Sequence, residues 1–181
     1  YGGCHIPRVE LAQSSSLRDS LGLGPAERML LSVGSLLDCK GHADLLEAMP
    51  SLLHKYPNAR LLIAGQGEQR AHLEAQIKRL ALDGQVRLLG YRPDAETLIA
   101  AADLIVHPSH AEGLSLVLIQ AQMLEKPIVA TAVGGAAEVL QIAAPEQCSS
   151  WIAQPHDSVS LATCMLQALT AIESDITLAE R

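Results

Sequence analysis

Lys40 is the residue whose position most clearly suggests ligand binding. It comes directly before Gly41, where a helical pattern begins, and the N-terminal end of a helix carries positive partial charge. A lysine there is unfavourable by a few tenths to about 1 kcal/mol unless an anion shares the site. The alternative is an exposed lysine in a long loop. Ligand binding is favoured only if a second segment of the chain could also bind an anion.

The second segment has the sequence EGLS and begins at Glu112. Ser115 is a typical N-cap for a helix that begins at Leu116, and Gly113 lets a ligand approach the backbone closely. The amides of Leu114–Val117 would then form an anion site. Glu112 would repel a phosphate, so it needs another partner, such as sugar hydroxyls. The alternative is an ordinary strand–loop–helix connection with a capping serine.

Alternating patterns predict the elements that position these residues. Short apolar runs indicate strands, and longer stretches with hydrophobic residues at helical spacing separate them. We expect strands at Met29–Val33, Arg60–Ala64, Val86–Leu89, Leu104–His107 and Pro127–Thr131, with Trp151–Ala153 as a candidate sixth. We expect helices at Gly41–Lys55, Glu68–Leu82, Asp94–Ala102, Ser115–Glu125, Ala136–Ile142 and Ser158–Ile172. This order predicts an α/β three-layer sandwich with a Rossmann-like parallel sheet, whose ligands bind beyond the carboxyl ends of the strands.

Composition limits the function classes. The 181 residues suit one domain, and the scarcity of aromatic residues (2%) implies an aliphatic core. The net charge of −7 and the lack of any Lys/Arg block argue against binding to nucleic acid or to an anionic membrane. The sequence contains no apolar run long enough to cross a membrane, and we expect no signal peptide. Widely spaced cysteines are typical of a reduced, cytoplasmic protein; they are Cys4, Cys39, Cys148 and Cys164.

Common cofactor motifs are missing from the sequence. Gly65-Gln66-Gly67 supplies only two of the three glycines of a dinucleotide loop, and Glu68 stands where a phosphate would bind. No GxxxxGK[ST] loop, no Cys/His ligand spacing and no D-x-D motif occurs. We therefore expect no cofactor and no metal.

Six ordered segments resemble the C-terminal domain of the family 4 (group 1) retaining glycosyltransferases, which have the two-domain GT-B fold. The resemblance covers residues 33–140, and its strength lies in the order of the segments. They are SVGSLLDCKG from Ser32, ARLLIAGQG from Ala59, VRLLGY from Val86, AADLIVHPS from Ala101, EGLSLVLIQ from Glu112 and KPIVATAVGG from Lys126.

The resemblance implies roles for individual residues. Lys40 falls on the family's diphosphate-binding lysine, whereas Ser35 replaces the arginine that accompanies it. Glu112 falls on the glutamate that binds the hydroxyls of the donor sugar, and Gln120 replaces the glutamate that binds the ribose. Gln120 keeps one hydrogen-bond acceptor and adds two donors, so it can still bond a ribose hydroxyl. We thus expect Lys40 and Glu112 to be catalytic.

Ser35, Gln120 and the Gly113–Val117 segment complete the expected donor site. The segment consists of Gly113, Leu114, Ser115, Leu116 and Val117. Tyr91 and Arg92 are candidates for the border of the nucleobase. We interpret His107 as a strand-end packing residue and Glu138 as a structural hydrogen-bonding residue.

The resemblance implies transfer of a sugar, of the hexosyltransferase type, from a nucleotide diphosphate sugar to a hydroxyl acceptor with retention. Polysaccharide, lipopolysaccharide and glycolipid synthesis are the expected settings. We expect residues 1–28 to be a linker from a missing N-terminal domain and residues 29–181 to be the donor-binding domain, inactive alone. The acceptor sugar or lipid-linked sugar, and any peripheral membrane contact, would involve the missing domain. Two alternatives stay open, a non-catalytic nucleotide-sugar-binding scaffold and a GT-B-type sugar-nucleotide epimerase.

Overall fold

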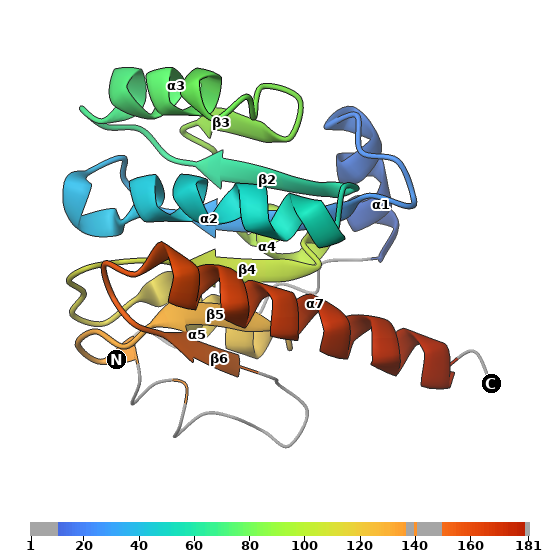
Figure 1. Cartoon of the computed structure of the whole chain (residues 1–181). Helices are drawn as coiled ribbons and strands as arrows, with labels where there is room; N and C mark the ends of the chain where they lie inside the picture. Colours follow the sequence, from blue (N-terminus) through green and yellow to red (C-terminus); the bar gives the residue numbers. More distant parts are fainter. Residues whose placement is uncertain (1–10, 137–139, 141–149, 180–181) are drawn as a thin grey trace.

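A six-stranded parallel sheet forms the middle layer of the computed structural model, which describes residues 11–136, 140 and 150–179 (Figure 1). Its order is β3-β2-β1-β4-β5-β6, and each neighbouring pair is parallel. The predicted strands, including the sixth, are confirmed to within one residue at each end. The strands are β1 (Arg28–Val33), β2 (Ala59–Ala64), β3 (Val86–Gly90), β4 (Leu104–His107), β5 (Ile128–Thr131) and β6 (Ser150–Ala153).

Helices cover both faces of this sheet and complete the predicted three-layer sandwich. In Figure 1, α2, α3 and α7 lie in front of the sheet, and α4 and α5 lie behind it. The helices are α1 (Leu11–Ser20), the short 3₁₀ helix η1 (Asp38–Lys40), α2 (His42–Lys55), α3 (Arg70–Arg79), α4 (Ala95–Ala101), α5 (Leu116–Met123) and α7 (Ser158–Ala179). Of the helix predicted at Ala136–Ile142, only Ala136 and Leu140 are described, and both are helical.

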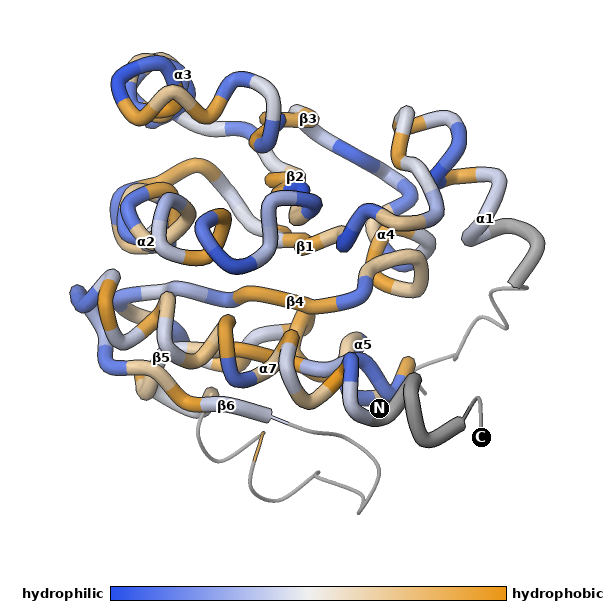
Figure 2. Tube along the Cα trace, turned by 45° about the vertical axis from the view of Figure 1, so that its right-hand side comes forward, coloured by the Kyte–Doolittle hydropathy of each residue, from blue (hydrophilic) through white to orange (hydrophobic). Residues whose placement is uncertain are grey.

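Two hydrophobic clusters, one on each face of the sheet, form the core. Successive residues of a strand point to opposite faces, so Leu30 belongs to the cluster under α2 and α7, and its neighbours Met29 and Leu31 belong to the other. Figure 2 shows the hydrophobic colouring along the central strands β1 and β4. The core is aliphatic, as the composition predicts, because both faces of a parallel sheet are buried.

The described part of the segment before β1, which begins at Leu11, packs against the domain. The guanidinium of Arg18 donates hydrogen bonds to Asp103 Oδ2 at 3.0 Å, to the Ala101 carbonyl at 3.1 Å and to the Glu27 carbonyl at 2.6 Å. Leu21 and Leu23 are buried in the second cluster. Residues 11–27 are therefore an integral part of the domain, tied to the end of α4.

The middle of the sheet contains a topological switch point. From β1 the chain moves to β2 and β3 on one side, and it then returns to β4 on the other side of β1. In such sheets the crevice for a ligand lies where the two connections diverge, beyond the carboxyl ends of these strands. The connections that follow β1 and β4 carry Lys40 and Glu112. Among the described residues, no helix has the length and apolar character needed to cross a membrane.

Candidate functional site

Lys40 and Glu112 meet at the switch point and form an ion pair. Lys40 Nζ lies 2.6 Å from Glu112 Oε2, and the two side chains are only 22% and 12% exposed. The predicted helix start is confirmed, since Lys40 ends η1 and α2 begins at His42. Glu112 thus supplies the anion that a lysine at this helix start requires, and the structure brings together the two residues expected to be catalytic.

The connection after β1 lies directly against the connection after β4. The backbone amide of His110 donates to the Cys39 carbonyl at 2.8 Å. Gly41 has a φ of 65°, and a Cβ atom at this position would lie 1.9 Å from the Pro108 carbonyl oxygen. Only glycine permits this approach. Backbone contacts therefore hold Lys40 beside Glu112.

Side chains of the β4 end surround the Glu112 carboxylate. Ser109 Oγ donates to Glu112 Oε2 at 3.0 Å, and His107 Nε2 lies 3.2 Å from the same oxygen. Thr131 at the end of β5 donates to the Ser109 carbonyl. His107 is buried at the strand end, as expected for a packing residue, but its contact with Glu112 places it in the site as well.

Electrostatics keep Glu112 ionised and His107 neutral. Burial by itself raises the pKa of the Glu112 carboxyl, but hydrogen bonds from Lys40 and Ser109 outweigh burial, so this pKa lies below its ordinary value. Burial lowers the pKa of His107, with a further contribution from the charge of Lys40, and the attraction of Glu112 only partly opposes them. The site therefore contains one lysine cation and one carboxylate near neutral pH.

His42 lies beside this pair and was missed by the sequence analysis. Its Nδ1 is 3.5 Å from Ser32 Oγ, and its Nε2 makes no hydrogen bond of normal geometry within the described part of the chain. Burial lowers the pKa of His42 to about 4. Nothing in the sequence indicates that His42 is buried, because a histidine in the first turn of a helix is as compatible with an exposed position as with a buried one.

The predicted cap of α5 is confirmed. Ser115 has extended backbone angles, and its Oγ accepts a hydrogen bond from the Leu118 amide at 3.4 Å. Leu114 and Leu116 on either side are 65% and 69% exposed, which leaves this helix start open to solvent. The first-turn amides of a helix have no partner within the helix, so this end of α5 can bind an anion.

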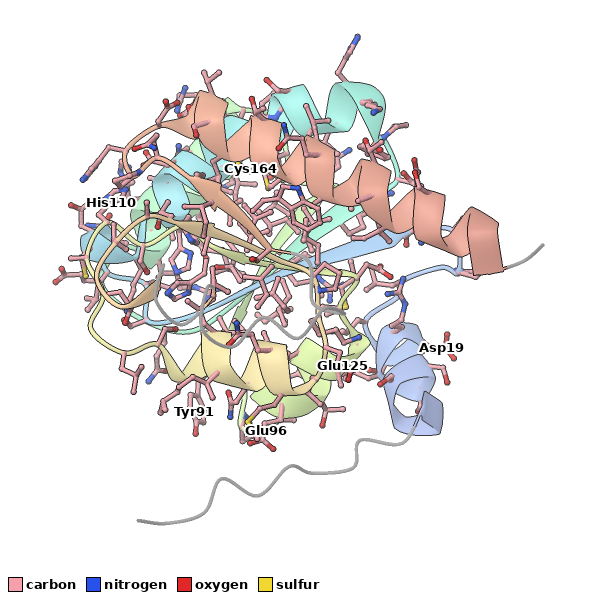
Figure 3. All side chains as sticks on the ribbon, turned by 90° about the horizontal axis from the view of Figure 1, so that it is seen from below. Asp19, Tyr91, Glu96, His110, Glu125 and Cys164 are labelled. Atoms are coloured by element: carbon pink, nitrogen blue, oxygen red, sulfur yellow. The ribbon has the colours of Figure 1, made fainter. Side chains whose placement is uncertain are left out.

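The other predicted donor-site residues lie around the same edge of the sheet. Ser35 is exposed in the connection that carries Lys40, and Gln120 on α5 donates to Glu96 Oε1 on α4 at 3.0 Å. Arg92 pairs with both carboxylate oxygens of Asp94, at 2.7 and 2.5 Å. Tyr91 is largely exposed, and Figure 3 shows it on the same side of the molecule as Glu96.

Some predicted residues cannot be placed. Glu138, Cys4 and Cys148 lie outside the described residues. Cys39 and Cys164 are free cysteines, exposed and buried respectively.

Gly65-Gln66-Gly67 has a structural role. The Gln66 carbonyl accepts from the Leu36 amide at 3.0 Å, and the Leu36 carbonyl accepts from the Gln69 amide at 3.0 Å. This segment therefore supports the connection that carries Lys40.

A second polar cluster was also missed. One ligand atom from each of Asp44, His110 and His156 lies within 4.8 Å of the others. The three residues come from segments that are far apart in sequence, so their spacing gives no local motif.

Comparison with known proteins identifies the family of this chain. The family model for glycosyl transferases group 1 matches residues 13–175. The chain is 33% identical to the lipopolysaccharide glucosyltransferase WaaG of Escherichia coli (strain K12), over 84% of this chain and 40% of the relative. It is also 33% identical to the D-inositol 3-phosphate glycosyltransferase of Corynebacterium urealyticum, over 96% of this chain and 42% of the relative.

Solved structures show the same fold. The crystal structure of Anabaena Alr3699/HepE in complex with UDP-glucose is 30% identical, with a TM-score of 0.81 over 97% of this chain and 47% of that one. The crystal structure of WaaG is 28% identical, with a TM-score of 0.81 over 94% and 45%. The chain thus spans less than half the length of these proteins. The match of the family model and the ordered set of site segments show that this chain belongs to the group 1 glycosyltransferases.

Proposed function

We propose that this chain is the donor-binding half of a retaining glycosyltransferase that uses a nucleotide diphosphate sugar. The observation that carries the proposal is the Lys40–Glu112 ion pair, which lies at the switch point of the sheet beside the open start of α5. A cation and a helix start together suit a diphosphate, and the carboxylate suits the sugar hydroxyls. The structure of the Anabaena protein with UDP-glucose supports this class of donor.

In this proposal, donor binding exchanges the partner of Lys40. The diphosphate binds the ammonium group and the first amides of α5, and the Glu112 carboxylate, no longer paired with Lys40, accepts hydrogen bonds from the sugar hydroxyls. Ser109 and His107 keep the carboxylate in place during the exchange, because both contact Glu112 Oε2. Lys40 and the amides then stabilise the charge that develops on the departing diphosphate. These groups already supply positive charge, so we propose that donor binding needs no divalent cation.

In this proposal, Gln120 and Glu96 together bind the ribose. The family glutamate is replaced at Gln120, but the Gln120 amide holds the Glu96 carboxylate at 3.0 Å. The pair still offers carboxylate oxygens to ribose hydroxyls. Ser35 adds no charge, so Lys40 is the cation on which the diphosphate depends. We retain Tyr91 and Arg92 as a proposed border of the nucleobase.

We further propose that the acceptor, a sugar or lipid-linked sugar, binds outside these 181 residues. The chain spans less than half the length of its relatives, so a complete transfer would require the rest of such a protein. A cytoplasmic enzyme with membrane contact only through the acceptor-binding part fits this proposal. The chain alone should transfer no sugar.

Isothermal titration with UDP, UDP-glucose, GDP and GDP-mannose tests the site. Lys40→Ala should weaken the nucleotide diphosphate and its sugar alike, by roughly 10- to 150-fold, because a charge-assisted contact contributes about 1.5–3 kcal/mol. Glu112→Gln should leave UDP as tight as before, or tighter because Lys40 is freed, and should weaken the sugar-bearing donor. Lys78→Ala, which removes an exposed lysine of α3, is the matched control.

If Lys40→Ala and Glu112→Gln both leave donor affinity almost unchanged in a protein that binds UDP, the donor binds elsewhere.

A chelator should leave donor affinity unchanged. A loss of affinity that Mg²⁺ restores would contradict the proposal that donor binding needs no metal. Donor consumed without acceptor would indicate the epimerase alternative.

A further inference from the structure

Asp44, His110 and His156 come together at the carboxyl edge of the sheet, one from a helix and two from connections. Asp44 is in the first turn of α2, His110 follows β4, and His156 lies between β6 and α7. Their ligand atoms lie within 4.8 Å of one another. Figure 3 shows His110 at the opposite end of the molecule from Asp19 of α1. Asp44 and His110 are half-buried, and His156 is exposed.

Hydrogen bonds to the backbone position two of the three side chains, those of His110 and His156. The His110 amide bonds to the Cys39 carbonyl at 2.8 Å. Asp157 caps α7, because its Oδ1 accepts from the Val159 and Ser160 amides at 3.0 and 2.9 Å, which fixes the turn that carries His156. Side chains held in this way need only small rotations to adopt a common geometry.

The side chains already contact one another. His110 Nε2 is 2.7 Å from Asp44 Oδ2, and the ring centroids of His110 and His156 are 3.7 Å apart with an interplanar angle of 32°. Two imidazoles and one carboxylate are a ligand set that Zn²⁺ uses with a fourth position open. With bonds of about 2.0–2.2 Å, tetrahedral ligand atoms lie about 3.3–3.6 Å apart. The present separations require shifts on the order of 1 Å, which an exposed His156 permits.

We propose that Asp44, His110 and His156 bind a Zn²⁺ ion at the rim of the crevice, with a fourth position open to water. The ion joins α2, the connection that carries Glu112 and the turn before α7. It is distinct from the donor site, because its ligands are not the residues that contact the Lys40–Glu112 pair.

Titration of the chain with Zn²⁺ alone tests this proposal, with Co²⁺ as a spectroscopic probe. The unmodified chain should bind one equivalent, and Co²⁺ should give the visible absorption of a tetrahedral site. Asp44→Asn and His156→Asn should each weaken binding by at least about tenfold. Asparagine suits position 156 because the backbone φ there is 58°, and asparagine tolerates this left-handed conformation.

His72→Asn is the matched control, because His72 is an exposed histidine on α3. It should leave Zn²⁺ affinity unchanged. Zn²⁺ should also raise the unfolding temperature of the unmodified chain and of His72→Asn, but not that of His156→Asn. Failure of the unmodified chain to bind micromolar Zn²⁺ would overturn the proposal. So would binding that survives both Asp44→Asn and His156→Asn. None of these measurements involves a nucleotide, so they are independent of the proposed donor site.

Discussion

Protonation of His42 should make the domain unstable in mild acid. His42 is 3% exposed, and its burial lowers the pKa from 6.5 to about 4. Between these two values the unfolded chain holds a proton on His42 and the folded chain does not. The unfolded state then binds more protons, so lowering the pH favours unfolding. The stability that depends on neutral His42 is complete above pH 6.5 and is lost as the pH falls toward 4.

The size of this effect follows from the pKa difference. One pKa unit corresponds to about 1.4 kcal/mol, so the free energy of unfolding should fall by about 2–3 kcal/mol between about pH 7.5 and about pH 4.5. His107 adds to the loss, because burial also lowers its pKa. The contribution of His42 alone is the difference in pH dependence between the unmodified chain and His42→Gln, because other groups titrate in both proteins.

Urea denaturation at several pH values measures this difference. The unmodified chain should lose more stability in acid than His42→Gln, and His72→Gln should behave as the unmodified chain does. If His42→Gln does not fold, titration of the His42 ring by NMR should give a pKa well below 6.5 in the native chain. Identical pH slopes in the two proteins, or a His42 ring that titrates near 6.5, would refute the reasoning.

Three further changes test the architecture around the site. Ser115→Ala removes the cap of α5 and should cost about 1 kcal/mol of unfolding free energy in urea; a neutral result would mean that the cap contributes nothing. Gly134→Ala forces a side chain onto a φ of 50° and to 1.8 Å from the Glu112 carbonyl oxygen, so calorimetry should show weaker UDP-glucose binding than in the unmodified chain. Unchanged affinity there would show that this backbone contact does not position Glu112. Asp103→Ala removes the ionic partner of Arg18 and should lower the free energy of unfolding, measured in urea, by about 1–3 kcal/mol. An unchanged free energy would mean that the attachment of residues 11–27 through Arg18 does not stabilise the domain.

The strands could be predicted because the local pattern and the tertiary environment agree. Each is an aliphatic run that a parallel sheet buries on both faces, and turn residues limit its ends. Lys40 and Ser115 could be found for a similar reason, since a helix start makes specific local demands on charge and capping. Both residues stand out because the neighbouring sequence already indicates that a helix begins there.

Other features depend on contacts that no local pattern contains. Residues 11–27 have a weak pattern, and their attachment depends on Arg18 reaching Asp103. The group of Asp44, His110 and His156 exists only because parallel strands end at one edge. The Lys40–Glu112 pair shows the same limit, because the sequence predicts an anion beside Lys40 but not that the protein supplies it.

The close backbone approaches at Gly41 and Gly134 also bear on how the specificity of the proposed donor site can change. At Gly41 and Gly134 one connection packs against a carbonyl oxygen of another so closely that no Cβ atom fits, so the backbone alone makes these two contacts. The side chains of Ser35, Leu114 and Leu116 are exposed at the rim and take no part in those two contacts. In the proposed donor site, substitutions at these exposed positions should therefore alter which nucleotide or sugar is accepted without moving the backbone, whereas a side chain added at either glycine should disturb the binding of every donor.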